Sequence, residues 1–393
     1  MSMRLFGPTL LCIVWTCFVF LLFRLIDKRL FIGHPKSPDL TLSPDQRQRL
    51  DPLGAVQFQL ETNKWHNRAV KSKHRFEILG VTVCSIPSGL VIESALDPYL
   101  THIDSSSGPG VLWCRLISTF TVLVIIFAFR RPNHRHLVDR LRAEWLRLQL
   151  HCCLARVGDF FADHNSAHSD QEHKTIQVLN TAKGFCDSSC RNDEAFLTQE
   201  FRRIRDLCAH QRDNISNSHF DNAITESRIK AYLTERVGEQ YGLGIIPGYF
   251  GNTARRMRRN YTTTVWIANV SLLLSGIVLI LFAITQLSES VATVWSQLFS
   301  AVALLFVAVR SIFAWDSKAA LYDRQSHDLE RAAKVMIDCD REISVSGTRM
   351  NSNERQQIGN RFLVSAANFE SLMASEAYDW MLINDRSYFD VSP

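Results

Sequence analysis

Five long runs of apolar residues interrupt this otherwise polar chain of 393 residues. The mean hydropathy of −0.04 hides this division, because strongly apolar and strongly polar segments average out. A helical run of about 20 apolar residues is long enough to cross about 30 Å of hydrocarbon. The pattern therefore excludes an ordinary water-soluble globule and predicts an all-α membrane protein. The runs cover residues 6–25, 78–92, 111–129, 265–287 and 291–315.

The spacing of the runs predicts an N-terminal transmembrane anchor followed by two transmembrane helical hairpins. Short linkers at 101–110 and 288–290 join runs two and three and runs four and five, so each pair forms a hairpin. The first run closes with charged residues and no small-x-small cleavage site, which favours an anchor over a cleaved signal peptide. The predicted units are the anchor at 1–29, the first hairpin with its preceding segment at 30–136, a cytoplasmic helical region at 137–262, the second hairpin at 263–315 and a cytoplasmic helical hairpin at 316–393.

Lys and Arg residues beside the runs set the expected orientation, since such residues are retained on the cytoplasmic side. Residues 27–75 hold ten of them, both hairpin linkers hold none, and four arginines lie within 255–259. We therefore expect every long segment in the cytoplasm and a multi-pass protein of the cell inner membrane. The net charge is only +5 and the basic residues form no single stripe, so the sequence predicts no nucleic-acid partner.

Helical periodicity indicates how the cytoplasmic segments pack. Apolar residues within 137–157 recur every three or four positions beside an Arg-rich face, which is typical of an amphipathic helix. This helix would pack against another helix or lie on anionic lipid through its arginines. Residues 316–346 continue from the fifth run as a helix, and a turn with an N-cap separates them from a helix at 354–383. We expect this helical hairpin to pack against partner helices, which favours a homo-oligomer, and 158–225 to form helices broken by loops.

Polar residues inside the second hairpin are the first candidate functional residues, because each costs free energy in lipid unless it faces protein or water. Asn269 lies in the fourth run, and Thr293, Gln297 and Ser300 share one face of the fifth. We expect all four to face inward, where they would form interhelical hydrogen bonds, line a conductive path, or do both. Arg310 lies near the cytoplasmic end and is interpreted as an anchor whose side chain extends to the membrane surface.

Catalytic and metal-binding motifs are missing from the sequence. It contains no nucleophile elbow, H-E-x-x-H, P-loop or paired-carboxylate motif, so we expect no enzyme activity and no cofactor. Cys186, Cys190, Cys208 and His210 have the chemistry of zinc ligands, but their spacing matches no standard finger. We expect free cysteines on helices and no metal site.

A second set of candidate residues lies outside the apolar runs. Arg140, Glu144 and Arg147 follow the first hairpin, and Glu376 and Trp380 lie one helical turn apart near the end. In these residues and in its layout, the chain resembles the SLATT-type (SMODS- and SLOG-associated) transmembrane effectors of bacterial conflict systems. Trp380 would pack into the helical bundle or recognise a ligand.

The resemblance covers most of the chain and implies a membrane effector that oligomerises and forms a pore or disrupts the membrane. Such proteins act in a bacterial conflict or stress response, such as antiviral defence, when a partner reports infection. Relatives of this layout often carry an N-terminal nucleotide-binding domain where this chain has its first apolar run, so a separate nucleotide-sensing protein is an expected partner beside the lipid bilayer. The glycine-rich segment at 242–251 also departs from the family pattern. A non-conducting scaffold that anchors a cytoplasmic partner is the alternative function.

Overall fold

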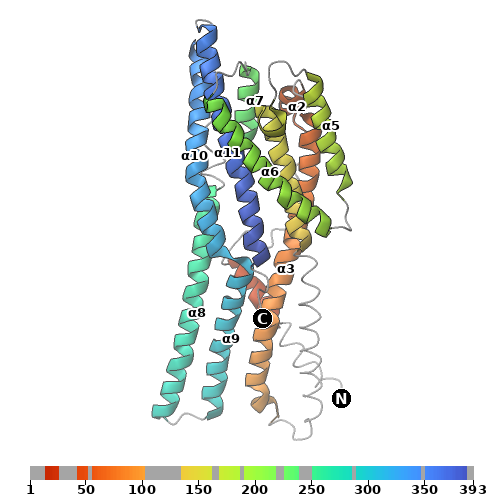
Figure 1. Ribbon diagram of the computed structural model, residues 1–393. Helices are drawn as coiled ribbons and strands as arrows, with labels where there is room; N and C mark the ends of the chain where they lie inside the picture. The colour runs from red at the N-terminus through yellow and green to blue at the C-terminus, as the bar shows by residue number, and fades with distance from the viewer. Residues whose placement is uncertain are drawn as a thin grey trace.

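The computed structural model is helical and has no strand among the residues that it describes. These are residues 14–25, 42–51, 55–101, 134–161, 168–185, 190–217, 225–238, 250–285, 289–346 and 350–386. The expected all-α class is therefore confirmed for this part of the chain. Figure 1 shows an elongated molecule with a broad helical bundle at one end and a narrower group of long helices, among them α8 and α9, at the other.

The two ends of the molecule are built from different helices. The bundle end contains α2 (Pro44–Leu50), the first half of α3 (Val56–Thr101), a helix at 134–155, η2 (Gly158–Phe160), α5 (His168–Gly184), α6 (Cys190–Asn217), α7 (Glu226–Arg236), α10 (Trp315–Ser346) and α11 (Ser352–Arg386). The apolar end contains the helix Val14–Leu25, the second half of α3, α8 (Asn252–Thr285) and α9 (Glu289–Phe313). The helices found within 158–225 confirm the interpretation of that stretch as helices broken by loops.

Two helices of the described chain are long and apolar enough to cross a membrane: α8, and the segment Val291–Val345 that joins α9 to α10. The helix Val14–Leu25 is shorter. Apart from Ile176 and Val345, every exposed large hydrophobic side chain that the structure describes lies on Val14–Leu25, α8 or α9. The apolar end therefore presents hydrophobic side chains outward, whereas the bundle end encloses them.

A separate hydrophobic core holds each end together. The core of the bundle includes Trp145, which is buried, and the aromatic rings packed around it. At the apolar end, Phe23 of the N-terminal helix packs on Phe306 of α9, with ring centroids 5.3 Å apart. Phe76 of α3 packs edge-on against Phe313 of α9 at 5.9 Å. These contacts join the Val14–Leu25 helix and α3 to the second hairpin.

The helix at 134–155 lies inside the bundle, and this decides between its two predicted roles. Leu141 and Trp145 on its apolar stripe are buried, as expected. Arg142 on the opposite face is buried too, because its guanidinium pairs with Asp139 at 3.0 Å and Asp193 at 2.5 Å. The helix therefore packs against other helices, and the alternative that its arginines lie on anionic lipid is wrong.

A break at Ala314 separates α9 from α10, although their sequences would allow one continuous helix. Ala314 has a φ of 45°, in the left-handed region, which costs a non-glycine residue roughly 1–2 kcal/mol. Helical hydrogen bonding continues across the break, since the Ala314 N–H donates to the Arg310 carbonyl at 3.0 Å and the Lys318 N–H donates to the Ala314 carbonyl at 3.1 Å. The change of direction brings α10 against the start of α8 and against α11.

The predicted helical hairpin at the end of the chain is confirmed as α10 and α11. Its turn ends at a reciprocal cap: the Asn351 side chain accepts from the Glu354 N–H at 2.8 Å, and the Glu354 carboxylate accepts from the Asn351 N–H at 3.1 Å. Each interaction satisfies a backbone group that the first turn of a helix leaves unpaired. The apolar faces of the two helices pack within this chain and not only against partners.

Several predicted features lie outside the described residues. They are the third apolar run at 111–129, all of the first linker except Thr101, Ser288 of the second linker, most of the glycine-rich segment, Cys186 and the two chain ends. The first transmembrane hairpin and the N-terminal anchor accordingly stay predictions.

Candidate functional site: a buried charged network

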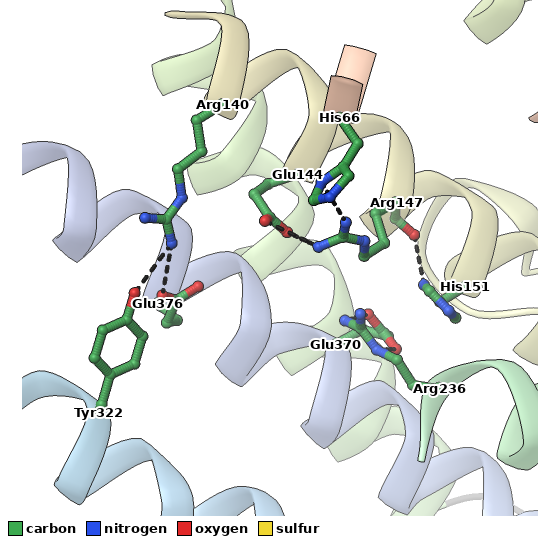
Figure 2. Close-up of polar contacts among 9 residues, drawn as sticks. All are labelled: His66, Arg140, Glu144, Arg147, His151, Arg236, Tyr322, Glu370 and Glu376. Atoms are coloured by element: carbon green, nitrogen blue, oxygen red, sulfur yellow. Dashed lines mark hydrogen bonds and ion pairs between the residues drawn. The ribbon is translucent and has the colours of Figure 1, made fainter. Parts of the chain in front are cut away.

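Nine polar residues from five helices meet inside the bundle. Figure 2 shows this set, named here the charged network: His66, Arg140, Glu144, Arg147, His151, Arg236, Tyr322, Glu370 and Glu376. Four of the five residues that carry the family resemblance belong to it, and the fifth, Trp380, contacts it. Residues that are far apart in the sequence are therefore brought together at one place.

Arg140 connects the helix at 134–155 to both helices of the C-terminal hairpin. Its guanidinium donates to the Tyr322 hydroxyl of α10 at 3.1 Å and lies 3.8 Å from a carboxylate oxygen of Glu376 on α11. The same group stacks over the Trp380 ring, 3.7 Å from its centre, in a cation–π contact. Trp380 is buried, so the structure favours packing into the bundle over ligand recognition for this side chain.

Glu144, Arg147 and His66 form a second part of the charged network. Arg147 donates from one guanidinium nitrogen to both carboxylate oxygens of Glu144 at 2.9 Å, and another of its nitrogens lies 3.4 Å from Nδ1 of His66. Burial and the charge of Arg147 lower the pKa of His66, which favours the neutral imidazole. Burial raises the pKa of Glu144, but Arg147 and Arg140 outweigh it, so the pKa lies below its ordinary value and Glu144 is ionised.

One fully enclosed ion pair of the charged network was not among the candidates that the sequence suggested. Arg236 of α7 donates to the two oxygens of Glu370 on α11 at 3.0 and 2.6 Å, and the Tyr232 hydroxyl donates to the same carboxylate at 2.6 Å. Glu370 is fully buried, and burial raises its pKa while Arg236 and Tyr232 oppose the rise. A signal was present in the sequence, since Glu370 is a lone carboxylate directly after Phe369 on the apolar face of its helix.

The carboxylate of Glu376 has fewer hydrogen-bond and ion-pair partners than that of Glu370, although both residues lie on α11. Its Oε1 accepts no hydrogen bond from any residue that the structure describes, and its contact with Arg140 is long. Burial raises the pKa of Glu376 to about 7, with Arg140 opposing the rise. Toward the apolar end, burial lowers the pKa of Lys318 to about 7, and Arg140 and Lys73 lower it further. Two buried groups, Lys318 just after the break at Ala314 and Glu376 on α11, therefore have pKa values near neutrality.

The charged network consists mainly of ion pairs, in which Glu144 and Glu370 are well paired and Glu376 is not. Such an arrangement fixes helices relative to each other and responds to charge, and it lacks the geometry of a general acid–base site. Its members join α3, the helix at 134–155, α7, α10 and α11. The arrangement therefore couples the segment that follows the predicted first hairpin to the segment that follows the second.

The four polar candidates of the second hairpin do not lie on one buried face. Ser300 is between α8 and α9, where its hydroxyl lies 3.3 Å from that of Ser275. Gln297 is half-buried, and Asn269 and Thr293 are exposed. Within the single chain, Ser300 therefore faces the partner helix of the hairpin, and Asn269 and Thr293 lie on its surface, so the expectation that these two face inward stays a prediction for an oligomer.

The size of the side chains explains why Ser300 lies between the two helices and Asn269 does not. The buried face of α8 is built mostly from small residues, because small side chains let two helix backbones approach closely. It consists of Ala254, Asn260, Thr264, Ala268, Ser271 and Ser275. Asn269, adjacent to Ala268, falls on the next face. Reading the spacing of small residues, rather than of polar ones, would have found the interface.

The cysteine and histidine residues considered as zinc ligands are only partly described. Cys208 is buried on α6 near Cys152, whereas His210 is two positions further along and hydrogen-bonds to Asn214 at 3.0 Å on the exposed side of α6. Cys186 lies outside the described residues, and so does the side chain of Cys190. Cys208 and His210 do not face one another.

Comparison of the chain with protein-family models, with curated proteins and with solved structures gives no match.

Proposed function

We propose that this protein is a multi-pass inner-membrane effector that oligomerises and opens an ion path or disrupts the membrane in a bacterial conflict or stress response. The lipid bilayer would surround α8 and α9, whose outward surfaces are apolar. The bundle would lie in the cytoplasm, beside the arginines that precede the span in α8. Arg310 supports this placement, because its guanidinium lies 5.0 Å from the centre of the Tyr261 ring near that end.

The observation that carries the proposal is the position of Asn269. Its amide is exposed on the outer surface of α8, where the neighbouring exposed residues include Trp266 and Leu273. An amide that faces lipid leaves its donors and acceptors unpaired, which costs free energy. Contact with a second copy of the chain or with a water-filled path removes this cost. The surface of the single chain is therefore suited to self-association.

A stripe along α9 that includes exposed residues supports the same conclusion. Thr293, Gln297, Ser300, Leu304 and Val307 follow one another at intervals of four and three residues, which places them on one stripe of the helix. Thr293, Leu304 and Val307 are exposed, and Gln297 and Ser300 are half-buried. This spacing is typical of a helix that packs against an identical helix. The Thr293 hydroxyl and the Gln297 side chain would contribute polar groups to an interior that the copies share, while Ser300 packs against α8.

The charged network supplies a route from the bundle to the membrane. Tyr322 and Glu376, the partners of Arg140, lie on α10 and α11, and α10 begins directly after α9. A partner that shifts the bundle would thereby change the position of α9. This proposal extends to a separate nucleotide-sensing protein only through the family resemblance.

An ion-flux assay on liposomes that contain purified, cross-linked oligomer tests the proposal. We expect flux from the parent protein and loss of flux from the double variant Asn269→Leu with Gln297→Leu, because both amides are removed from the shared interior. Ile280→Leu is the matched control, since Ile280 is exposed on the same helix and the change leaves polarity unaltered. The control should conduct like the parent.

Absence of flux from every oligomeric state would contradict a pore and favour the non-conducting scaffold. The scaffold would instead hold a cytoplasmic partner on the bundle, where α10 and α11 extend beyond the other helices (Figure 1). Flux that survives the double variant would show that Asn269 and Gln297 do not line the path. Reporter fusions at residues 105 and 289 test the topology, and a cytoplasmic signal at either site would overturn it.

A further inference from the structure

An open groove of about 410 Å³ lies between α6, α10 and α11, away from the charged network. Small-molecule sites commonly have volumes of about 300–1,000 Å³ and combine an apolar lining with a few convergent polar groups. Val335 of α10 and Val364 and Leu372 of α11 supply the apolar part of this lining. The volume of the groove thus falls within the range of small-molecule sites.

Two arginines line the groove. Arg212 of α6 is held across it by a hydrogen bond to the Asn368 side chain of α11, at 3.2 Å. Arg331 of α10 is exposed, and no ion pair or hydrogen bond joins it to another described residue. Asp328, one turn before Arg331, has no such partner within the described chain either. Arg212 is also paired with its neighbour Asp213 at 2.9 Å, whereas Arg331 has N–H donors that no described residue occupies and that are free for phosphate or carboxylate oxygens, so the groove favours an anionic ligand.

Ser365 is the second observation that indicates a ligand. Its side chain lines the groove and is only 8 % exposed. Buried serines in helices usually donate to a backbone carbonyl one turn earlier, as Ser88 does to Ser85 at 2.8 Å. The Ser365 hydroxyl makes no hydrogen bond to another residue that the structure describes. The Ser365 hydroxyl lines the groove with no protein partner among the described residues, so it is available to donate to a bound acceptor.

We propose that the groove between α6, α10 and α11 binds a small amphipathic anion. Its phosphate or carboxylate group lies between Arg212 and Arg331 and accepts from Ser365, while its apolar part covers Val335 and Leu372. Asp328 selects against ligands with further negative charge and in favour of those with a hydrogen-bond donor. A bound ligand would fasten α6 to the C-terminal hairpin. This site is independent of the proposed membrane activity.

Isothermal titration calorimetry of the full chain in detergent micelles tests the site, with phenyl phosphate and benzoate as probes. Both are charged enough to stay outside the micelle. We expect saturable binding of at least one probe, weakened about tenfold or more by Arg331→Ala, because a charge-assisted hydrogen bond is lost. Asp328→Asn should tighten binding, since neither probe carries a group for Asp328 and its charge repels both. Arg341→Ala is the matched control on α10, because Arg341 pairs with Asp338 and lies outside the groove.

The two probes separate the two sources of negative charge. Tighter binding of phenyl phosphate assigns the site to phosphate monoesters, and tighter binding of benzoate assigns it to carboxylates. No saturable binding of either probe would overturn the proposal. Binding that Arg331→Ala leaves unchanged would also overturn it, as would equal losses in Arg331→Ala and Arg341→Ala. Arg331 is exposed, so its replacement leaves the folded bundle intact, which circular dichroism checks.

Discussion

Replacement of Glu376 by glutamine should stabilise the protein above neutral pH, although Glu376 contacts an arginine. The pKa of this carboxyl group rises from an ordinary 4.5 to about 7 on folding, because the side chain is buried and its Oε1 accepts no hydrogen bond from the described residues. At about 1.4 kcal/mol per pH unit, this rise corresponds to about 3 kcal/mol. Glutamine has the same shape and carries no charge. Arg140 keeps its contacts with Tyr322 and Trp380 in the variant.

The sign of the effect depends on pH. Between pH 4.5 and about 7 the native state binds more protons at Glu376 than the unfolded state, so the stability contributed by this group is complete below 4.5 and is lost as the pH rises through 7. The variant should therefore match the parent under acidic conditions and exceed it at alkaline pH. For a chain of 393 residues, about 3 kcal/mol raises Tm by about 4 °C.

Thermal unfolding in detergent micelles, followed by tryptophan fluorescence across this pH range, measures the difference. Glu370→Gln is the matched control on the same helix, because Glu370 holds Arg236 and Tyr232 at hydrogen-bond distance. That change leaves the Arg236 charge buried and uncompensated, and should cost about 3–5 kcal/mol at all pH values near neutrality. A Glu376→Gln variant that is less stable than the parent at alkaline pH would refute the reasoning, because the pair with Arg140 would then outweigh burial.

Four further substitutions test the backbone and the hairpin, each by the same thermal unfolding measurement. Ala314→Gly should raise stability by about 1 kcal/mol, since glycine adopts a φ of 45° without the cost that alanine bears; no gain would show that the break is unstrained. Gly158→Ala should cost about 1–2 kcal/mol, because φ is 64° and the new Cβ would lie 3.4 Å from the Cys152 sulfur; an unchanged Tm would contradict this. Ser275→Leu should cost about 1–3 kcal/mol by forcing α8 from α9, whereas Asn269→Leu should leave the stability of the single chain unchanged.

Sequence patterns within a few residues predicted the helices whose ends and apolar faces are set by neighbouring residues. The hairpin of α10 and α11 was expected because apolar periodicity and a turn rich in Ser, Gly and Asn are both readable within a few residues. The cap formed by Asn351 and Glu354 belongs to the same class, since its partners are three residues apart. By contrast, the left-handed conformation of Ala314 depends on how α10 packs against distant helices, and nothing in the adjacent sequence specifies it.

The candidate site was predictable only in part, for a related reason. Arg140, Glu144, Arg147, Glu376 and Trp380 were identified from the resemblance, but their contacts join residues up to more than two hundred positions apart in the chain. No spacing rule pairs such residues before the topology is known. In the second hairpin, polarity suggested an inward face, yet close packing of helices selects by size. Both cases required the tertiary arrangement of the helices.

The break at Ala314 would allow α10 to turn as a rigid rod about its first residues. This helix has 32 residues and is therefore about 48 Å long at about 1.5 Å per residue. A turn of about 10° in the backbone at its base would carry its far tip through about 8 Å, with α11 travelling alongside. A small rearrangement where the two cores meet therefore produces a large displacement at the far tip of α10. Conversely, a force applied at that tip exerts a large torque on the backbone at Ala314.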